Sequence, residues 1–260
     1  MPDDGHETWL RFLAWLPAAQ PRGDVELMLR QHREWLAAHG ATDDEAHGAM
    51  REIMRRLNEG GEGWRLLFDK IYASPQPVFR TSANALLARV ATSRRPGRAL
   101  DVCMGEGRNT VFLAQQGWRT TGIDVSSEGL DQARRRAADA SVELTLIQES
   151  ADAFDYASQR WDLISVCYAP VPITDPAYVA RLTQTLEPGG VVVVESFASD
   201  REERVRKPVD IDPRDLRDAF AGFAIEELQD VIDVPDWAQE AERVVRMVAE
   251  KPVTSGDQPG

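Results

Sequence analysis

Apolar positions in the first sixty residues recur every three or four residues, and this period predicts amphipathic helices. Three such faces are present, made of Trp9, Phe12, Leu13 and Leu16, of Val25, Met28, Leu29, His32, Trp35 and Leu36, and of Ala46, Met50, Ile53, Met54 and Leu57. Pro17 and Gly60 follow the first and third faces as helix-ending residues. Asp24 is placed to cap the second helix, and Thr42 with Glu45 forms a capping-box pattern for the third. We therefore expect three helices.

The stretch up to residue 97 continues this helical pattern. A glycine-rich stretch at 60–63 is a candidate joint, and we expect short helices over 64–73 and 82–91. These features predict a helical N-terminal cap region at 1–63, a helical lead-in at 64–97, a Rossmann-like domain at 98–251 and a disordered tail at 252–260.

From residue 98 onward, apolar strands alternate with amphipathic helices. Strands are expected at 99–103, 119–123, 142–147, 162–167, 191–195, 223–231 and 243–250, the last two as an antiparallel pair. The strand Val191–Glu195 is almost wholly apolar, which is typical of a strand buried on both faces of a parallel sheet. This alternation predicts an α/β fold, a doubly wound Rossmann-like sheet of seven mostly parallel strands with an antiparallel last strand. Ligands of such sheets bind at the carboxyl ends of the strands.

The sharpest chemical pattern is ALDVCMGEGRNTVFLA at residues 99–114, a strand, a glycine turn and a helix. Gly105 and Gly107 allow the backbone to approach a ligand closely, and the helix start offers free N–H groups. A dinucleotide site would need a third glycine where the chain has Thr110. Asp101 would repel a pyrophosphate but suits a cationic ligand such as S-adenosylmethionine (SAM), which carries an ammonium and a sulfonium. A phosphate-binding loop is excluded, because the sequence has no G-x-x-x-x-G-K-[ST] pattern.

This stretch resembles motif I of the class I SAM-dependent methyltransferases in its D-x-G-x-G-R-N form, with Cys103 where the family usually has glycine or a small residue. The runs WDLISVCY at 161–168 and LEPGG at 186–190 are similar to the family's motif IV and to the turn before its fifth strand. The resemblance implies a small-molecule methyltransferase with SAM as cofactor and S-adenosylhomocysteine (SAH) as product. It implies cofactor binding by Asp101, Met104, Gly105, Glu106, Gly107, Asn109, Asp124, Val125, Ser126, Ser150, Ala151, Asp152 and Cys167.

Some of these positions have specific expected contacts. Asp124 ends the second strand nineteen residues after the first glycine of the turn, and its carboxylate can accept two ribose hydroxyls. Ser126 is the better cap for the following helix, which leaves Asp124 for the ligand. By the resemblance, Ser150 stands where the family has an acid that meets the adenine amino group. Either Asp152 makes this contact, or Ser150 and the N–H of Ala151 make it.

Three other side chains are candidates for catalytic or substrate contacts. In the family, an aromatic-rich segment before the first strand closes over SAM, which makes Tyr72 and Arg80 candidates for the methionyl carboxylate or the substrate. Tyr168 follows the fourth strand and, by the same analogy, shapes the acceptor pocket. The first and fourth strands lie side by side in that family. We therefore expect Cys103 and Cys167 to be neighbouring buried thiols and not a disulfide.

Composition narrows the range of partners. The 260 residues are 43% hydrophobic and carry a net charge of −13, which argues against a nucleic-acid substrate because a polyanion would be repelled. The sequence starts without a signal-peptide pattern, has no eighteen-residue apolar run and contains two cysteines. We therefore expect a cytoplasmic monomer or homodimer that acts on a small molecule, with no membrane partner.

The catalytic chemistry has few candidates for a base or a metal. The four histidines His6, His32, His39 and His47 all lie in the N-terminal helices, so a histidine general base would come from that region. His32 lies on the apolar stripe of its helix, which favours a core position. The acidic metal cluster of catechol-type methyltransferases is not apparent near motif IV, so we expect no metal.

The leading hypothesis is a SAM-dependent methyltransferase that transfers a methyl group to a small-molecule acceptor by in-line displacement. The first alternative is a SAM-binding protein of the same fold that does not methylate and uses the sulfonium electrostatically or in regulation. An NAD-dependent oxidoreductase is disfavoured by Thr110 and Asp101. A nucleic-acid methyltransferase is disfavoured by the net charge.

Overall fold

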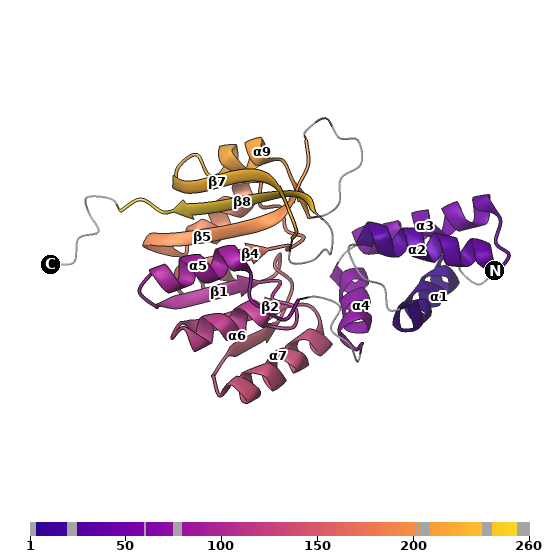
Figure 1. Ribbon diagram of the computed structural model, residues 1–260, viewed down its shortest axis with the longest axis horizontal. Helices are drawn as coiled ribbons and strands as arrows, with labels where there is room; N and C mark the ends of the chain where they lie inside the picture. Colours follow the sequence, from indigo (N-terminus) through magenta and orange to yellow (C-terminus); the bar gives the residue numbers. More distant parts are fainter. Residues whose placement is uncertain are drawn as a thin grey trace.

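The computed structural model describes residues 4–19, 25–59, 61–74, 80–200, 202, 209–235 and 241–253. An eight-stranded sheet with helices on both faces forms one part of the molecule, and the N-terminal helices form a second part beside it (Figure 1). The cap predicted at Asp24 and most of the tail predicted at 252–260 lie outside the described residues.

The sheet has the predicted doubly wound, Rossmann-like topology. Its order is β3-β2-β1-β4-β5-β8-β7, and a short extra strand, β6, pairs with β5. β8 is antiparallel to β5 and β7, whereas the other neighbouring pairs are parallel. The order reverses between β1 and β4, so a ligand is expected at the carboxyl ends of these strands. The strands are β1 Arg98–Val102, β2 Arg119–Asp124, β3 Thr145–Gln148, β4 Trp161–Cys167, β5 Leu186–Ala198, β6 Asp210–Ile211, β7 Ala224–Asp233 and β8 Glu242–Glu250.

Helices cover both faces of the sheet (Figure 1). One face carries α5 Ala85–Ser93, α6 Arg108–Gln115 and α7 Ser127–Ala140, and the other carries α8 Pro176–Thr183 and α9 Pro213–Ala219. Val191 and Val193 of β5 share a core with α5 and α6, whereas Val192 and Val194 share a core with α8 and α9. All four valines are inaccessible to solvent, which confirms that β5 is buried on both faces.

The three predicted N-terminal helices are present as α1 Asp4–Ala19, α2 Val25–Ala38 and α3 Asp43–Asn58. The capping box of Thr42 and Glu45 is formed as predicted. Helix α1 continues past Pro17, since a proline close to the helix end removes one backbone hydrogen bond while its φ remains compatible with a helix. The buried apolar residues of α1–α3 form one core, which includes Trp9, Phe12, Leu13, Trp15, Leu16, Met28, Ile53 and Leu57.

A fourth helix, α4, spans Gly61–Tyr72 and packs into the same core. The expectation of a glycine-rich joint followed by a helix from residue 64 is therefore corrected, because the glycines open the helix. A Cβ on Gly63 would lie 2.3 Å from the carbonyl oxygen of Arg56, so glycine lets α4 cross α3 at close range. Leu67 and Ile71 are buried by this packing. The domain boundary expected at residue 63 stays a prediction.

Two helix bounds differ from those predicted. Helix α5 begins at Ala85, because the Asn84 side chain accepts a hydrogen bond from the N–H of Leu87 over 3.0 Å and caps the helix there. The sequence pattern predicts a helix from about Pro176 to Leu186, whereas α8 ends at Thr183 and the chain enters β5 at Leu186.

The Pro188-Gly189-Gly190 run lies inside β5 and does not precede it as a separate turn. The pairing of β4 with β5 jumps from Trp161 opposite Leu186 to Leu163 opposite Val191, so the run forms an irregularity in the ladder. Gly189 has a φ of 77°, which a residue with a side chain rarely adopts.

Helix α4 joins the helical part to the carboxyl edge of the sheet. Asp69 accepts hydrogen bonds from the Ser126 hydroxyl over 2.6 Å and from the Glu128 N–H over 3.3 Å, at the start of α7. The Gln132 side-chain amide donates to the carbonyl of Tyr72. In Figure 1, α4 lies between the sheet and α1–α3. Helix α4 of the N-terminal part thus meets this edge through Asp69 and Tyr72.

Candidate active site

The turn after β1 uses left-handed backbone conformations at three positions. Cys103, Gly105 and Gly107 have φ values of 55°, 57° and 77°. Residues with a side chain rarely adopt such angles, which explains why a glycine is common where this chain has Cys103. Gly107 is the N-cap of α6 and supplies no side chain to its first N–H groups. The helix therefore presents its positive end at the carboxyl edge of the sheet.

Asp124 ends β2 directly beside this turn. Its Oδ2 accepts a hydrogen bond from the N–H of Gly105 over 2.8 Å, and its Oδ1 accepts one from the N–H of Ser126 over 2.9 Å. Ser126 caps α7 as predicted, because its hydroxyl accepts from the N–H of Gly129 over 3.1 Å. The cap does not leave Asp124 free, since each carboxylate oxygen already has a backbone partner. Each oxygen has a second lone pair with which to accept a ribose hydroxyl.

Asp101 lies on β1 beneath the turn and is 1% exposed. The hydroxyl of Thr110 donates a hydrogen bond to its Oδ2 over 2.7 Å. Burial raises the pKa of Asp101 from 3.8 to about 6. Thr110 stands where a dinucleotide site would have its third glycine, and here it is, with Ser165, a hydrogen-bond partner of the acid on β1.

Tyr72, the last residue of α4, lies against the glycine turn. A Cβ on Gly105 would lie 2.6 Å from its hydroxyl oxygen, so the phenol ring covers the turn. Burial first, and then the negative charges of Asp124 and Glu106, raise the pKa of Tyr72, so the phenol is neutral near pH 7. Arg80 is exposed, and its charge acts on Asp233 at the end of β7. Contacts of Tyr72 and Arg80 with SAM or substrate stay predictions.

The two alternatives for the adenine contact lie in the loop after β3. Ser150 is half-buried, and its hydroxyl accepts from the N–H of Ala153 over 3.2 Å. Ala151 is buried, whereas Asp152 is exposed and its charge acts on the thiol of Cys103. Both alternatives for the adenine contact stay predictions.

The other residues predicted for cofactor binding surround the turn. Met104 is buried, and its N–H donates to the carbonyl of Ile123 over 3.0 Å. Glu106 is 9% exposed and forms an ion pair with Arg136 over 3.3 Å. Val125 follows Asp124, and its carbonyl accepts a hydrogen bond from the side-chain amide of Gln148. Their roles in cofactor binding stay predictions.

A buried polar cluster at the ends of β4 and β5 was not predicted. Oε1 of Glu195 accepts from the Tyr168 hydroxyl over 2.8 Å and from the Asn84 side-chain amide over 2.7 Å, and its Oε2 accepts from Nε of Arg246 over 2.7 Å. The N–H of Asn84 also donates to Oδ1 of Asn109 over 2.8 Å, which links the cluster to α6. Glu195 and Tyr168 are each 2% exposed. The only sequence pattern that pointed to this Glu195 cluster was an acid at the end of a buried valine strand.

The two cysteines are free thiols; Cys167 is buried as expected, whereas Cys103 is only partly buried because it lies in the turn after β1. Val102 of β1 pairs with Val166 of β4, so Cys103 and Cys167 follow at adjacent positions. Burial raises the pKa of both thiols.

The histidines lie away from this edge. His32 is buried among aromatic rings, as predicted, and the Nδ1 atoms of His39 and His47 hydrogen-bond to carbonyl oxygens of their own helices. In Figure 1, α1–α3 lie on the far side of α4 from the sheet. No group of His, Cys, Asp and Glu that could hold a metal ion is found among the described residues. None of the helices that the structure describes is long and apolar enough to cross a membrane.

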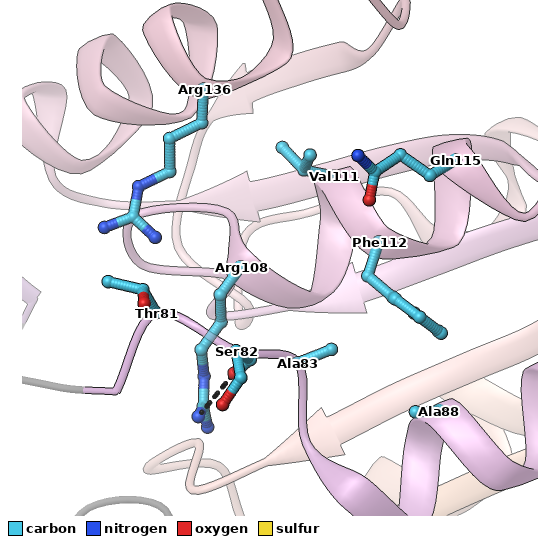
Figure 2. Close-up of a pocket in the computed structure, with 9 residues that line it drawn as sticks. All are labelled: Thr81, Ser82, Ala83, Ala88, Arg108, Val111, Phe112, Gln115 and Arg136. Carbon is cyan, nitrogen blue, oxygen red and sulfur yellow. Dashed lines mark hydrogen bonds between the residues drawn. The ribbon is translucent and has the colours of Figure 1, made fainter. Parts of the chain in front are cut away.

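A hollow of about 680 Å³ lies on the outer face of α6 (Figure 2). Arg108 and Arg136 project toward it, and Phe112 forms part of its wall. Neither the glycine turn nor Asp124 lines it, so this hollow is separate from the predicted cofactor edge.

Comparison with known proteins agrees with this geometry. Residues 99–190 match the family described as "Methyltransferase domain". The malonyl-[acyl-carrier protein] O-methyltransferase of Enterobacter lignolyticus is 33% identical over 139 residues, which cover 52% of this chain and 53% of that protein. The ubiquinone biosynthesis O-methyltransferase of Serratia proteamaculans is 35% identical over 95 residues, which cover 36% of this chain and 39% of that protein. The chain thus spans about half or less of the length of these relatives.

The fold is also shared with solved structures. TehB from Haemophilus influenzae superposes with a TM-score of 0.56 and 14% identity over 72% of this chain and 66% of that chain. A doubly wound sheet with a glycine turn after β1 and an acid at the end of β2 is typical of nucleotide-binding and SAM-binding α/β proteins. Residues 99–190 thus match a methyltransferase-domain family, which agrees with the resemblance of this stretch to the class I SAM-dependent methyltransferases.

Proposed function

We propose that this chain transfers a methyl group from SAM to a small-molecule acceptor by in-line displacement. The observation that carries the proposal is the contact of Asp124 with Gly105 at the carboxyl edge, inside the segment that matches a methyltransferase domain. The two O-methyltransferase relatives support an oxygen acceptor as the class to test first.

The residues around the turn fit SAM in charge. The carboxyl groups of Asp101, Glu106 and Asp124 surround the turn, and they suit a ligand that carries an ammonium and a sulfonium. A pyrophosphate at the same place would meet like charge. Bound SAM supplies a methyl group on a sulfonium, which is already a good leaving group.

The chain's own contribution is to bind, align and exclude water. Asp124 would hold the ribose, because its two oxygens keep lone pairs at the end of β2. Tyr72 covers the turn and shields it from solvent, which strengthens electrostatic contacts there. On the acceptor side, Glu195 fixes the position of the Tyr168 ring at the end of β4. Alignment of this kind is the main catalytic demand of a displacement with a good leaving group.

Thermal unfolding with SAM, SAH and NAD tests the cofactor assignment. A ligand at a hundred times its Kd stabilises the folded chain by about 2.7 kcal/mol. We expect shifts with SAM and SAH in the wild type and in Asp131→Ala, an exposed carboxylate on α7, but not in Asp124→Ala. A shift with NAD alone would overturn the proposal.

Turnover separates methylation from binding alone. The wild type is incubated with SAM and a panel of hydroxyl and carboxylate acceptors, and the SAH formed is measured. Release of SAH that depends on an acceptor supports methyl transfer. Binding of SAM with no SAH release from any acceptor class would instead favour the non-methylating alternative.

A further inference from the structure

A second hollow, of about 620 Å³, lies within the N-terminal helices, among α1, α2 and α3. Small residues make the room for it, since Gly5, Gly48 and Ala49 stand where larger side chains would fill the space. Leu36 lines it with an apolar surface and is 4% exposed. None of the residues assigned above to SAM or to the acceptor lines this hollow.

His32 lines the hollow and is 1% exposed. Its ring packs against those of Phe12, Trp15 and Trp35, with centroid distances of 5.1, 4.7 and 5.6 Å. Within the described residues, its Nδ1 is buried and has no hydrogen-bond partner. A buried polar atom without a partner is costly, so a ligand that supplied one would be favoured.

Arg11 lines the same hollow from α1. Its Cζ lies 5.7 Å from the centre of the Trp35 ring, the same ring on which His32 stacks. Its guanidinium makes no hydrogen bond or ion pair with the described residues, so its donors face solvent. Burial and the charge of Arg11 lower the pKa of His32 to about 4, so the imidazole is neutral at pH 7 and carries one N–H.

The carboxylates around the hollow already have partners. Oε2 of Glu45 accepts from the N–H and the hydroxyl of Thr42 over 2.7 and 2.8 Å. Glu52 accepts from the side chains of Arg55 and Arg56 on its own helix. The Arg11 donors and His32 therefore offer unused hydrogen-bonding capacity on the wall of the hollow.

We propose that this hollow is a binding site for a small organic carboxylate, whose anionic group meets Arg11 and His32 and whose apolar part lies over Leu36. The guanidinium supplies the charge and the planar donors that carboxylates prefer. The N–H of the neutral imidazole can be held on Nδ1 once an acceptor is present. The site is independent of the proposed methyl transfer, because it uses none of the same residues.

Binding of phenylacetate, with uncharged phenylacetamide as the shape-matched probe, tests the proposal on the full chain. We expect saturable binding of phenylacetate by calorimetry and at least tenfold weaker binding of phenylacetamide. Arg11→Gln should weaken phenylacetate binding at least tenfold. The control Arg33→Gln removes an exposed charge beside His32 on the same helix and should bind as the wild type does. Asp124→Ala should also bind as the wild type does, whether or not the chain binds SAM.

A second measurement does not depend on mutating the core. In a chain labelled with nitrogen-15 in histidine, phenylacetate should shift the ring signals of His32 and leave those of exposed His47 in place. No saturable binding of phenylacetate, equal binding of the amide, or equal loss in Arg11→Gln and Arg33→Gln would each overturn the proposal. So would ring signals of His32 that do not respond to phenylacetate.

Discussion

The N–H of Gly105 donates a hydrogen bond to Oδ2 of Asp124 over 2.8 Å. This contact ties the turn after β1 to the end of β2, its neighbour in the sheet. Tyr72 lies on the same glycine from the side of α4, and Ser126 holds the second carboxylate oxygen from the start of α7. The glycine turn, the acid and α4 thus form one unit at the carboxyl edge.

Gly105→Ala should destabilise this unit. The new methyl would lie 2.6 Å from the Tyr72 hydroxyl oxygen, at a residue whose φ is 57°. Overpacking and the left-handed backbone together should lower the free energy of unfolding by about 2–4 kcal/mol. Urea denaturation measures the change. The control Gly222→Ala meets no atom within 4 Å and should change stability by about 1 kcal/mol or less.

The double variant Gly105→Ala/Tyr72→Phe separates the two causes. Removing the hydroxyl relieves the overlap but not the backbone strain, so part of the lost stability should return. The free energy of unfolding is measured for Gly105→Ala, Tyr72→Phe and the double variant. If the loss in the double variant equals the sum of the losses in the two single variants, the Tyr72 hydroxyl does not contact the turn as described.

The buried carboxyl of Asp101 makes stability depend on pH. Its pKa is raised from 3.8 to about 6 in the folded chain. Between about pH 4 and pH 6 the folded chain therefore holds a proton that the unfolded chain has lost. The stabilisation from this proton is complete below a pH of about 4 and is lost as the pH rises through about 6. Asp101→Asn cannot ionise, so it should gain about 3 kcal/mol relative to the wild type between pH 4 and pH 7.5.

Urea denaturation at several pH values across that range measures this gain. Asp131→Asn, which alters an exposed carboxylate, should follow the wild-type profile. Parallel profiles for Asp101→Asn and the wild type would show that Asp101 ionises normally in the folded chain.

The Glu195 cluster should be sensitive to charge removal. Glu195→Gln leaves Arg246 with a weaker partner at a site where the acid is 2% exposed, and we expect a loss of about 3 kcal/mol in the free energy of unfolding. Glu227→Gln breaks an ion pair with Arg89, whose side chain is 59% exposed, and should cost about 0–1 kcal/mol. Equal losses in the two variants would contradict a buried, structurally required carboxylate.

Asp69→Ala should loosen α4 from the sheet. The change removes acceptors for the Ser126 hydroxyl and the Glu128 N–H, which costs about 1–2 kcal/mol locally. Hydrogen exchange of the α4 amides should therefore speed up about tenfold, while exchange in β5 stays unchanged. Glu62→Ala, at an exposed position on the same helix, serves as the control. Unchanged exchange in α4 would show that Asp69 does not anchor it.

Local patterns were enough to predict most of the secondary structure. The valines of β5 are buried on both faces, the capping box at Thr42 forms, and Ser126 caps α7, because each depends on residues close in sequence. The glycine turn and the acid at the end of β2 were also predictable, since the crossover topology brings the ends of parallel strands together.

Contacts between distant segments depended on the tertiary structure. Glu195 is 111 residues from Asn84 and 51 from Arg246. The pairing of β5 with β8 sets Glu195 opposite Arg246, and the packing of α5 on the sheet brings its N-cap, Asn84, to the same carboxylate. The position of α4 also depended on tertiary packing. The glycine at position 63 is typical of a joint between domains, but here it allows α4 to pack closely on α3. The sequence by itself determined the alternation of strands and helices and the chemistry of the glycine turn, because both arise from local periodicity. Only the tertiary structure decided which side chains share the buried Glu195 cluster and which helix covers the turn, because those depend on packing between segments far apart in the chain.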